Sequence, residues 1–434
     1  YNMSMKRSQL PAVVMVSTDL SILKEGSPAH RRMREYGNLF AELHIVLFTR
    51  RFGKRASRMG GSNVSRGVLV PATIQIGQNV LVHSTQSWSR WCFVRDGVRV
   101  GRAVLARLLK RTPSNQIVIS TQDPFETGLV GKRLADKFAL ALQVQVHTDF
   151  MSPYFCWPTF SFVGLLNRMR RRIARAVLAR ASSVRVVSER IRKSLMGSHV
   201  WHPDHIQVLP IYVDPFAWAL SQDVHARVGG EREADWVQLP HWETTGLMAC
   251  RLTKEKQVDL ALRAFAKAVR VAPKTGLIIA GEGPERPHLE RLARKLGIEH
   301  QVLFVGWQRR LLPFFHSADF LLSTSLFEGY GMTMVEAMLA GMPVISSDTG
   351  IAGSLLIDGR NGYVFPLGAG NAKEAENQLF TKMTKLIMHP ELREQFGEAA
   401  ARDARKHAYP SHGAYLKAYQ EGVLSALSSR VSRG

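Results

Sequence analysis

Short apolar runs alternate along this chain with longer segments whose apolar positions recur every three or four residues. Such runs are PAVVMV, TGLMAC, GLIIAG, VLFVG and MPVIS, and polar or glycine-containing turns follow them. The segment FALALQVQVHTDF alternates apolar and polar residues, as a strand does. A short apolar run predicts a buried strand, and the three-to-four spacing predicts an amphipathic helix. Repeated strand-then-helix units predict parallel sheets with helices on both faces, so we assign the chain to the α/β class.

The length of 434 residues and the hydrophobic content of 45% allow two domains with full cores. We predict a first domain over residues 1–203 and a second over 204–412. A polar insertion at about 221–243 interrupts the periodicity of the second domain. Residues 413–434 predict a final helix.

Residues 326–341 read LFEGYGMTMVEAMLAG and carry two carboxylates, Glu328 and Glu336. Gly329 and Gly331 allow a tight turn and a close approach to a ligand, and residues 332–340 have the composition of a buried helix. Free N–H groups at the start of such a helix attract anions. Glu336, about two helical turns further on, could accept hydrogen bonds from hydroxyl groups. The segment therefore predicts a phosphate and a sugar held side by side.

The segment TGLMACRLTKEKQVDLALRAFAKA predicts a strand, a polar turn with Arg251 and Lys256, and a helix. In open α/β sheets, ligands bind at such turns, at the carboxyl ends of strands. Two fixed cations at such a turn would stabilise negative charge on a ligand, and one preorganised contact of this kind is worth roughly 3 to 4 kcal/mol.

These segments together resemble GT-B glycosyltransferases of the large retaining group, the glycosyltransferase family 4-like "glycosyl transferases group 1". The E-x7-E spacing of Glu328 and Glu336, the RL-x3-K turn, the loop GEGP at 281–284 and the run VLFVGW occur in the order typical of that group. The resemblance implies two Rossmann-like doubly wound domains facing a central cleft, and a final helix at residues 413–434 that folds back onto the first domain. It also implies a hexosyltransferase-type enzyme that moves a sugar from a nucleotide diphosphate sugar to a glycan or lipid-linked acceptor.

By this resemblance, Arg251 and Lys256 grip the donor diphosphate, Glu328 contacts the transferred sugar and Glu336 accepts from the nucleotide ribose. From the residues alone, a double-displacement nucleophile stays open as another role for the two carboxylates. The resemblance assigns catalysis to Glu328, His147, Arg251 and Lys256, and donor binding to Gly26, Arg251, Lys256, Gly281, Gly283, Val305, Gly306, Glu328, Gly329, Tyr330, Gly331, Met332 and Glu336.

Two of these residues lie in the first half of the chain, which the resemblance assigns to the acceptor. Gly26 follows the first predicted strand and matches a glycine turn that lies against the donor phosphates in the family. His147 ends the strand pattern of FALALQVQVHTDF, where family members often have a histidine beside the reacting sugar.

Two segments depart from the family pattern. The usual Gly-Gly-x-Pro-Glu turn is replaced by residues 350–354, GIAGS, which lack its acidic residue, so the identity of the donor sugar is in doubt. The usual Pro-Asn-Gly-Val-Asp at the domain crossover is PIYVD at 210–214, which predicts a loop of another shape.

The sequence contains no DxD motif and no His or Cys cluster at ligand spacing, so we expect no metal and no other cofactor. Cys92, Cys156 and Cys250 are isolated, as expected for a reducing compartment. No run of 18 apolar residues and no signal-peptide pattern is present. We therefore expect a cytoplasmic protein.

The net charge of +23 is concentrated in the first half of the chain. Residues 1–200 carry 32 basic against 10 acidic side chains, and residues 201–434 carry 26 against 25. Residues 87–111 and 167–180 interleave Arg with apolar or aromatic residues, as surfaces that contact anionic lipid headgroups do. The one-sided charge indicates a membrane face or an anionic acceptor, and we expect the chain to act peripherally at the inner face of the membrane.

Two other functions stay open from the sequence. A basic nucleic-acid-binding protein without catalysis would explain the pI of about 10.4 and the Arg runs. It would give no role to the candidate donor-binding residues in the nearly neutral second half. We also see no zinc-finger or RNP-like motif, so no nucleic acid is expected. A nucleotide-sugar epimerase or a phosphorylase would keep the fold and change the chemistry.

Overall fold

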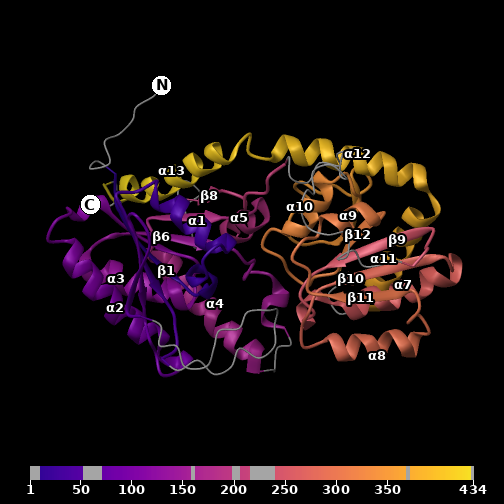
Figure 1. The fold of residues 1–434 in the computed structure, drawn as a ribbon, viewed down its shortest axis with the longest axis horizontal. Coiled ribbons are helices and arrows are strands. Elements are labelled where there is room, and N and C mark those ends of the chain that lie inside the picture. The colour runs from indigo at the N-terminus through magenta and orange to yellow at the C-terminus, as the bar shows by residue number, and fades with distance from the viewer. Residues whose placement is uncertain are drawn as a thin grey trace. The chain divides into compact units, whose positions relative to one another are not determined.

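The computed structural model describes residues 10–51, 71–157, 162–197, 206–215, 240–367 and 372–431. Contacts within the chain form two compact units (Figure 1). Unit 1 comprises residues 1–210 and 411–434, and unit 2 comprises residues 211–410. The sequence places the boundary near residue 203, which lies outside the described residues, as does most of the polar insertion predicted at 221–243.

Unit 1 is built on an eight-stranded sheet of order β3-β4-β2-β1-β5-β6-β7-β8. The central strands are apolar and buried throughout, because helices cover both faces of a doubly wound sheet. The strands are β1 (Ala12–Ser17), β2 (Glu42–Leu47), β3 (Thr73–Gly77), β4 (Val80–Ser84), β5 (Ile117–Thr121), β6 (Ala141–Val146), β7 (Ser183–Val186) and β8 (Ile206–Val208).

All neighbours in this sheet pair in parallel except β3, which is antiparallel to β4. The predicted pattern of strand and helix units does not include this hairpin. Only Gln78 and Asn79 separate the two strands, and a connection of that length can join only antiparallel strands. β3 is also less buried than the strands at the centre, as expected at a sheet edge.

The helices of unit 1 include α13, which packs against β5, β6 and β7 although it is the last element of the chain. Tyr419 of α13 is fully buried and stacks on Tyr36 of α1 with ring centroids 4.0 Å apart. The helices are α1 (Pro28–Gly37), α2 (Phe93–Leu108), α3 (Glu126–Phe138), α4 (Phe162–Arg180), α5 (Glu189–Met196) and α13 (His412–Val431); the 3₁₀ helices are η2 (Leu20–Leu23), η3 (Arg90–Cys92), η4 (Ser114–Gln116) and η5 (Pro153–Cys156).

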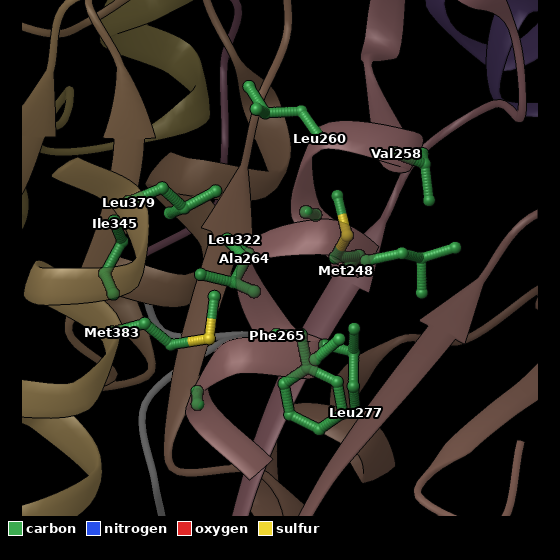
Figure 2. Close-up of a cluster of buried hydrophobic side chains, with 14 of the residues drawn as sticks. Met248, Val258, Leu260, Ala264, Phe265, Leu277, Leu322, Ile345, Leu379 and Met383 are labelled. Carbon is green, nitrogen blue, oxygen red and sulfur yellow. The ribbon is translucent and has the colours of Figure 1, made fainter. Parts of the chain in front are cut away.

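Unit 2 has a six-stranded parallel sheet of order β11-β10-β9-β12-β13-β14. Figure 2 shows one face of its core, where Phe265 and Leu277 lie close to Met248. The strands are β9 (Thr244–Ala249), β10 (Thr275–Ala280), β11 (Val302–Gly306), β12 (Phe320–Ser323), β13 (Val344–Ser347) and β14 (Gly362–Phe365). The helices are η8 (Lys254–Lys256), α7 (Val258–Val271), α8 (Arg286–Leu296), α9 (Leu312–Ser317), α10 (Met332–Leu339), α11 (Ala372–Met388) and α12 (Pro390–His407).

Candidate functional site

The predicted donor-binding segments of unit 2 converge at one point of its sheet. β9 lies between β10 and β12, and the chain continues from β9 to β10 and β11 on one side before it returns to β12, β13 and β14 on the other. At such a switch point, the loops after two neighbouring parallel strands turn away from each other and leave room for a ligand. The loop after β9 carries Arg251 and Lys256, and the loop after β12 carries Glu328.

Lys256 and Glu328 are in direct contact across this point. The Lys256 Nζ donates to Glu328 Oε1, and the Ser325 hydroxyl donates to the same oxygen at 2.8 Å. Both charged side chains are largely buried, with exposed fractions of 13% and 20%. Thr324 holds the turn in place because its hydroxyl donates to the Lys256 carbonyl at 2.8 Å. A cation and a carboxylate are therefore fixed side by side.

Arg251 lies on the same turn but is directed to solvent, with 77% of its side chain exposed. Its nearest carboxylate is Glu255 Oε1, 3.6 Å from Arg251 Nη2. An exposed ion pair of this kind contributes at most about 1 kcal/mol. Arg251 can therefore exchange Glu255 for a ligand anion at little cost.

Gly281 and Gly283 bring the loop after β10 against the same turn. A Cβ at Gly281 would lie 1.8 Å from the Cys250 carbonyl oxygen, and one at Gly283 would lie 2.1 Å from that of Leu252. Close packing on the turn thus requires both glycines. The Gly281 N–H donates to the Gly306 carbonyl at 2.7 Å, which places the end of β11 beside them. Gln308 Nε2 donates to the Val305 carbonyl at 2.6 Å.

Residues 329–332 form the turn into α10. Gly331 has φ +90, a left-handed conformation that favours glycine, and it precedes the first helical residue, Met332. The first N–H groups of an α-helix have no acceptor inside the helix, so the start of α10 can bind an anion. Burial raises the pKa of Tyr330 to about 12, so its hydroxyl is neutral.

Glu336 lies further along α10, and within the described residues its carboxylate has no hydrogen-bond or ion-pair partner. Burial raises the pKa of Glu336 to about 7. A partly buried carboxylate without a partner is costly, and a ligand hydroxyl that donates to it would lower that cost.

We expect Glu336→Gln to raise the unfolding temperature at about pH 8 but not at about pH 5. The folded state keeps a proton that the unfolded chain loses near pH 4.5, so this group's contribution to stability is complete below that pH and is lost as the pH rises through about 7. The loss is on the order of 3 kcal/mol, and the neutral glutamine escapes it. Calorimetry at both pH values measures the difference, with the exposed Glu398→Gln as control. An equal gain at both pH values would contradict the assignment.

Gly26 and His147 belong to unit 1. Gly26 has φ +75, and a Cβ there would meet no atom within 4 Å, so conformation rather than packing favours glycine. His147 directly follows β6, and its Nε2 lies 3.2 Å from Gln145 Oε1. Burial, followed by the charges of Arg185 and Arg32, lowers the pKa of His147 to about 3.

The structure adds two residues that the sequence analysis does not name, Ser325 and Thr324, which fix Glu328 and Lys256. Gly350, in the segment that departs from the family pattern, lies against the same loop, since a Cβ there would be 2.6 Å from the Tyr330 carbonyl oxygen. The hydroxyls in LLSTSLFEG, directly after a strand, are a signal that could have found the first two. Within the described ranges, no three His, Cys, Asp or Glu side chains are grouped so that they could hold a metal ion.

The sequence of residues 237–403, which carries this site, matches the family model for glycosyl transferases group 1. This segment, which lies within unit 2, is therefore assigned to that family. Alpha-monoglucosyldiacylglycerol synthase from Streptococcus pneumoniae is 26% identical to this chain over 252 residues, which are 57% of this chain and 55% of that protein. The chain spans about half the length of several curated relatives that it matches.

The likeness to solved structures shows that this chain has the GT-B fold, with two Rossmann-like domains. Sucrose-phosphate synthase from Thermosynechococcus elongatus matches 95% of this chain and 98% of its own, with a TM-score of 0.69 and 18% identity. HepE from Anabaena, solved in complex with UDP and glucose, matches 91% and 95% of the two chains, with a TM-score of 0.62 and 18% identity. At these identities the likeness concerns the fold alone.

Proposed function

We propose that this protein is a retaining glycosyltransferase that moves a hexose from a nucleotide diphosphate sugar to a glycan or lipid-linked acceptor. The observation that carries the proposal is the contact between Lys256 and Glu328 at the switch point of unit 2, beside the exposed Arg251. The UDP and glucose in the HepE complex support the donor class, and the lipid product named in the pneumococcal synthase supports a lipid-linked acceptor.

In this proposal the diphosphate of the donor contacts positive groups, and the hydroxyls of its sugar and ribose contact carboxylates. The diphosphate lies against Arg251, Lys256 and the start of α10, which stabilise the negative charge that develops as the sugar leaves. Glu328 accepts hydrogen bonds from the sugar hydroxyls, and Glu336 accepts from the ribose. Gly26 and His147 of unit 1 serve the donor phosphates and the reacting sugar. We propose that the two cations make a metal ion unnecessary.

A panel of UDP-, GDP- and ADP-sugars tests the proposed function. Release of the nucleoside diphosphate should depend on added acceptor, should continue in excess EDTA, and should give a product with the anomeric configuration of the donor. Release without acceptor, a product of inverted configuration, or complete loss of activity in EDTA would each reject the corresponding part of the proposal. The family match disfavours a nucleic-acid-binding protein, an epimerase and a phosphorylase.

We also propose that unit 1 docks on an anionic lipid surface. Large apolar side chains are exposed just before α2 (Trp88 and Trp91) and at the start of α4 (Phe162 and Leu165). α2 follows β4 and α4 follows β6, so both helices begin near the same edge of the sheet. The excess positive charge of residues 1–200 complements anionic headgroups. No helix within the described residues is long and apolar enough to span a bilayer.

Sedimentation with vesicles containing about one third phosphatidylglycerol should therefore pellet the protein at low salt and progressively less as the salt rises. Replacing Trp88 and Trp91 by serine should lower the partition constant roughly tenfold or more, because each buried aromatic side chain contributes about 1.5 to 3 kcal/mol. Met388→Ser in unit 2, also exposed, is the control. Binding that is equal with purely zwitterionic vesicles, or unchanged by the tryptophan substitutions, would reject this surface.

A further inference from the structure

A buried guanidinium stands at the centre of a polar network in unit 1. Arg185 of β7 is buried, and no ion pair within the described residues includes it. It donates only to neutral oxygens: from Nη1 to Gln145 Oε1 at 3.0 Å, from Nη2 to the Leu209 carbonyl at 3.2 Å, and from Nη2 to the Tyr415 hydroxyl at 3.0 Å. A buried charge without a carboxylate is costly, so these hydrogen bonds are needed to keep it inside.

Arg185 fixes the orientation of the Gln145 amide. A guanidinium has donors and no acceptor, so the amide must present its oxygen to Arg185. If the amide were rotated by 180°, its NH₂ group would face the Arg185 Nη1 donor at 3.0 Å, and neither group could accept. The nitrogen of the amide supports the same orientation, because Gln145 Nε2 lies 3.2 Å from the Ser120 hydroxyl and 3.3 Å from the Tyr419 hydroxyl, and can donate to both. Ser120 donates its own proton to Gln143, which leaves its oxygen to accept.

The same amide oxygen determines the tautomer of His147. Gln145 Oε1 lies 3.2 Å from His147 Nε2, and this oxygen can only accept. The proton of the neutral ring must therefore be on Nε2, and Nδ1 keeps its lone pair. Within the described residues, Nδ1 has no hydrogen-bond partner.

We propose that Arg185 is a positioning residue that, through the Gln145 amide, holds His147 as the Nε2–H tautomer and leaves Nδ1 to accept a hydrogen bond from a substrate hydroxyl. This inference rests on the proposed function of His147 beside the reacting sugar. It assigns one orientation to the ring, in which the substrate is the donor and the histidine is the acceptor. Arg185 thus determines the tautomer, and with burial of the ring and the charge of Arg32 it also favours the neutral state.

The network also connects His147 to the two places where the chain leaves and re-enters unit 1. Arg185 binds the carbonyls of Leu209 and Pro210, the last residues before unit 2. Its partner Tyr415 lies in the first turn of α13, just after the chain returns at Ser411. Through Tyr415, α13 therefore belongs to the network that orients the His147 imidazole.

Long-range ¹H–¹⁵N NMR of the full chain reads the tautomer without any substrate, and the His147→Gln variant identifies the signal. The wild type should show protonated Nε2 and an unprotonated Nδ1. Arg185→Met should give a mixture of tautomers and a higher pKa of His147, because a lowering charge is gone. Arg185→Lys, which also has only donors, should restore the Nε2–H form at least in part. Transfer in Arg185→Met should fall on the order of tenfold in kcat/KM for the acceptor.

Gln145→Met keeps the arginine and its carbonyl partners, so it tests the same step if Arg185→Met does not fold. Gln145→Met should also give a mixture of His147 tautomers. The nucleoside diphosphate affinity of both variants should stay that of the wild type, because Arg251, Lys256 and the start of α10 lie in unit 2 and no hydrogen bond within the described residues joins Gly26 to Arg185 or Gln145. A wild-type ring protonated on Nδ1, or variants that stay entirely Nε2–H, would overturn the proposal. A changed tautomer with unchanged transfer would overturn the positioning role. A wild type with no transfer would refute the proposed function instead, and the NMR result would still decide the tautomer.

Discussion

Replacing Lys256 by methionine is expected to lower kcat/KM for sugar transfer by about a hundredfold or more, the loss typical of one preorganised charge contact in a transition state. Lys256 is held by Glu328 and by the turn that Thr324 fixes, so it needs no reorganisation when charge develops on the leaving diphosphate. Methionine keeps most of the apolar stem and removes only the charge. The effect should fall mainly on kcat, because the charge of the leaving group is larger in the transition state than in the bound donor.

Lys274 provides a matched control for this substitution. It pairs with Glu243 at 2.6 Å, directly before β10 and β9, at the opposite edge of the same sheet. Both partners are well exposed, with fractions of 73% and 69%. Lys274→Met should leave transfer within about twofold, because surface pairs contribute little. Equal effects of the two lysine substitutions on kcat, or none from either, would remove Lys256 from the site.

The strands and helices around this site follow from local pattern. The apolar runs before Arg251 and after Gly341 become β9 and β13, because strands buried on both faces need an uninterrupted apolar sequence. The contact between Lys256 and Glu328 does not follow from local pattern. It depends on β12 returning to pair with β9, and no feature of either segment states which strands are neighbours. Only the family resemblance placed the two residues together.

Other residues stand out in the sequence, but their role depends on contacts that only the structure shows. Gly281 and Gly283 suggested a loop that approaches a nucleotide, whereas the structure shows that packing on the Cys250–Leu252 turn already requires both glycines. In unit 1, Gln143 and Gln145 share one face of β6, and His147, directly after the strand, continues the same period of two. Polar residues in an apolar strand indicate a buried network, but the partners, Arg185 and α13, are remote in sequence.

Replacing Glu328 by glutamine tests which role the carboxylate has. If it only orients the sugar, the loss in kcat should be about a hundredfold or more, since glutamine keeps the shape and one acceptor oxygen but loses the charge. Ser325 can still donate to that oxygen, whereas Lys256 loses its ion-pair partner. Glu243→Gln, which removes the carboxylate of the control pair, should leave kcat within about twofold.

A second variant, Glu328→Ala, separates an orienting carboxylate from a covalent nucleophile, the alternative that the sequence left open. A nucleophile forms a glycosyl-enzyme bond, and its removal leaves a space in which a small anion can attack the sugar. Added azide would then restore turnover of Glu328→Ala and give a glycosyl azide of inverted configuration. We expect no rescue, because Lys256 and Ser325 both bind Glu328 Oε1, as suits a side chain held as a hydrogen-bond acceptor. Azide-dependent formation of the inverted product would replace the orienting role by double displacement.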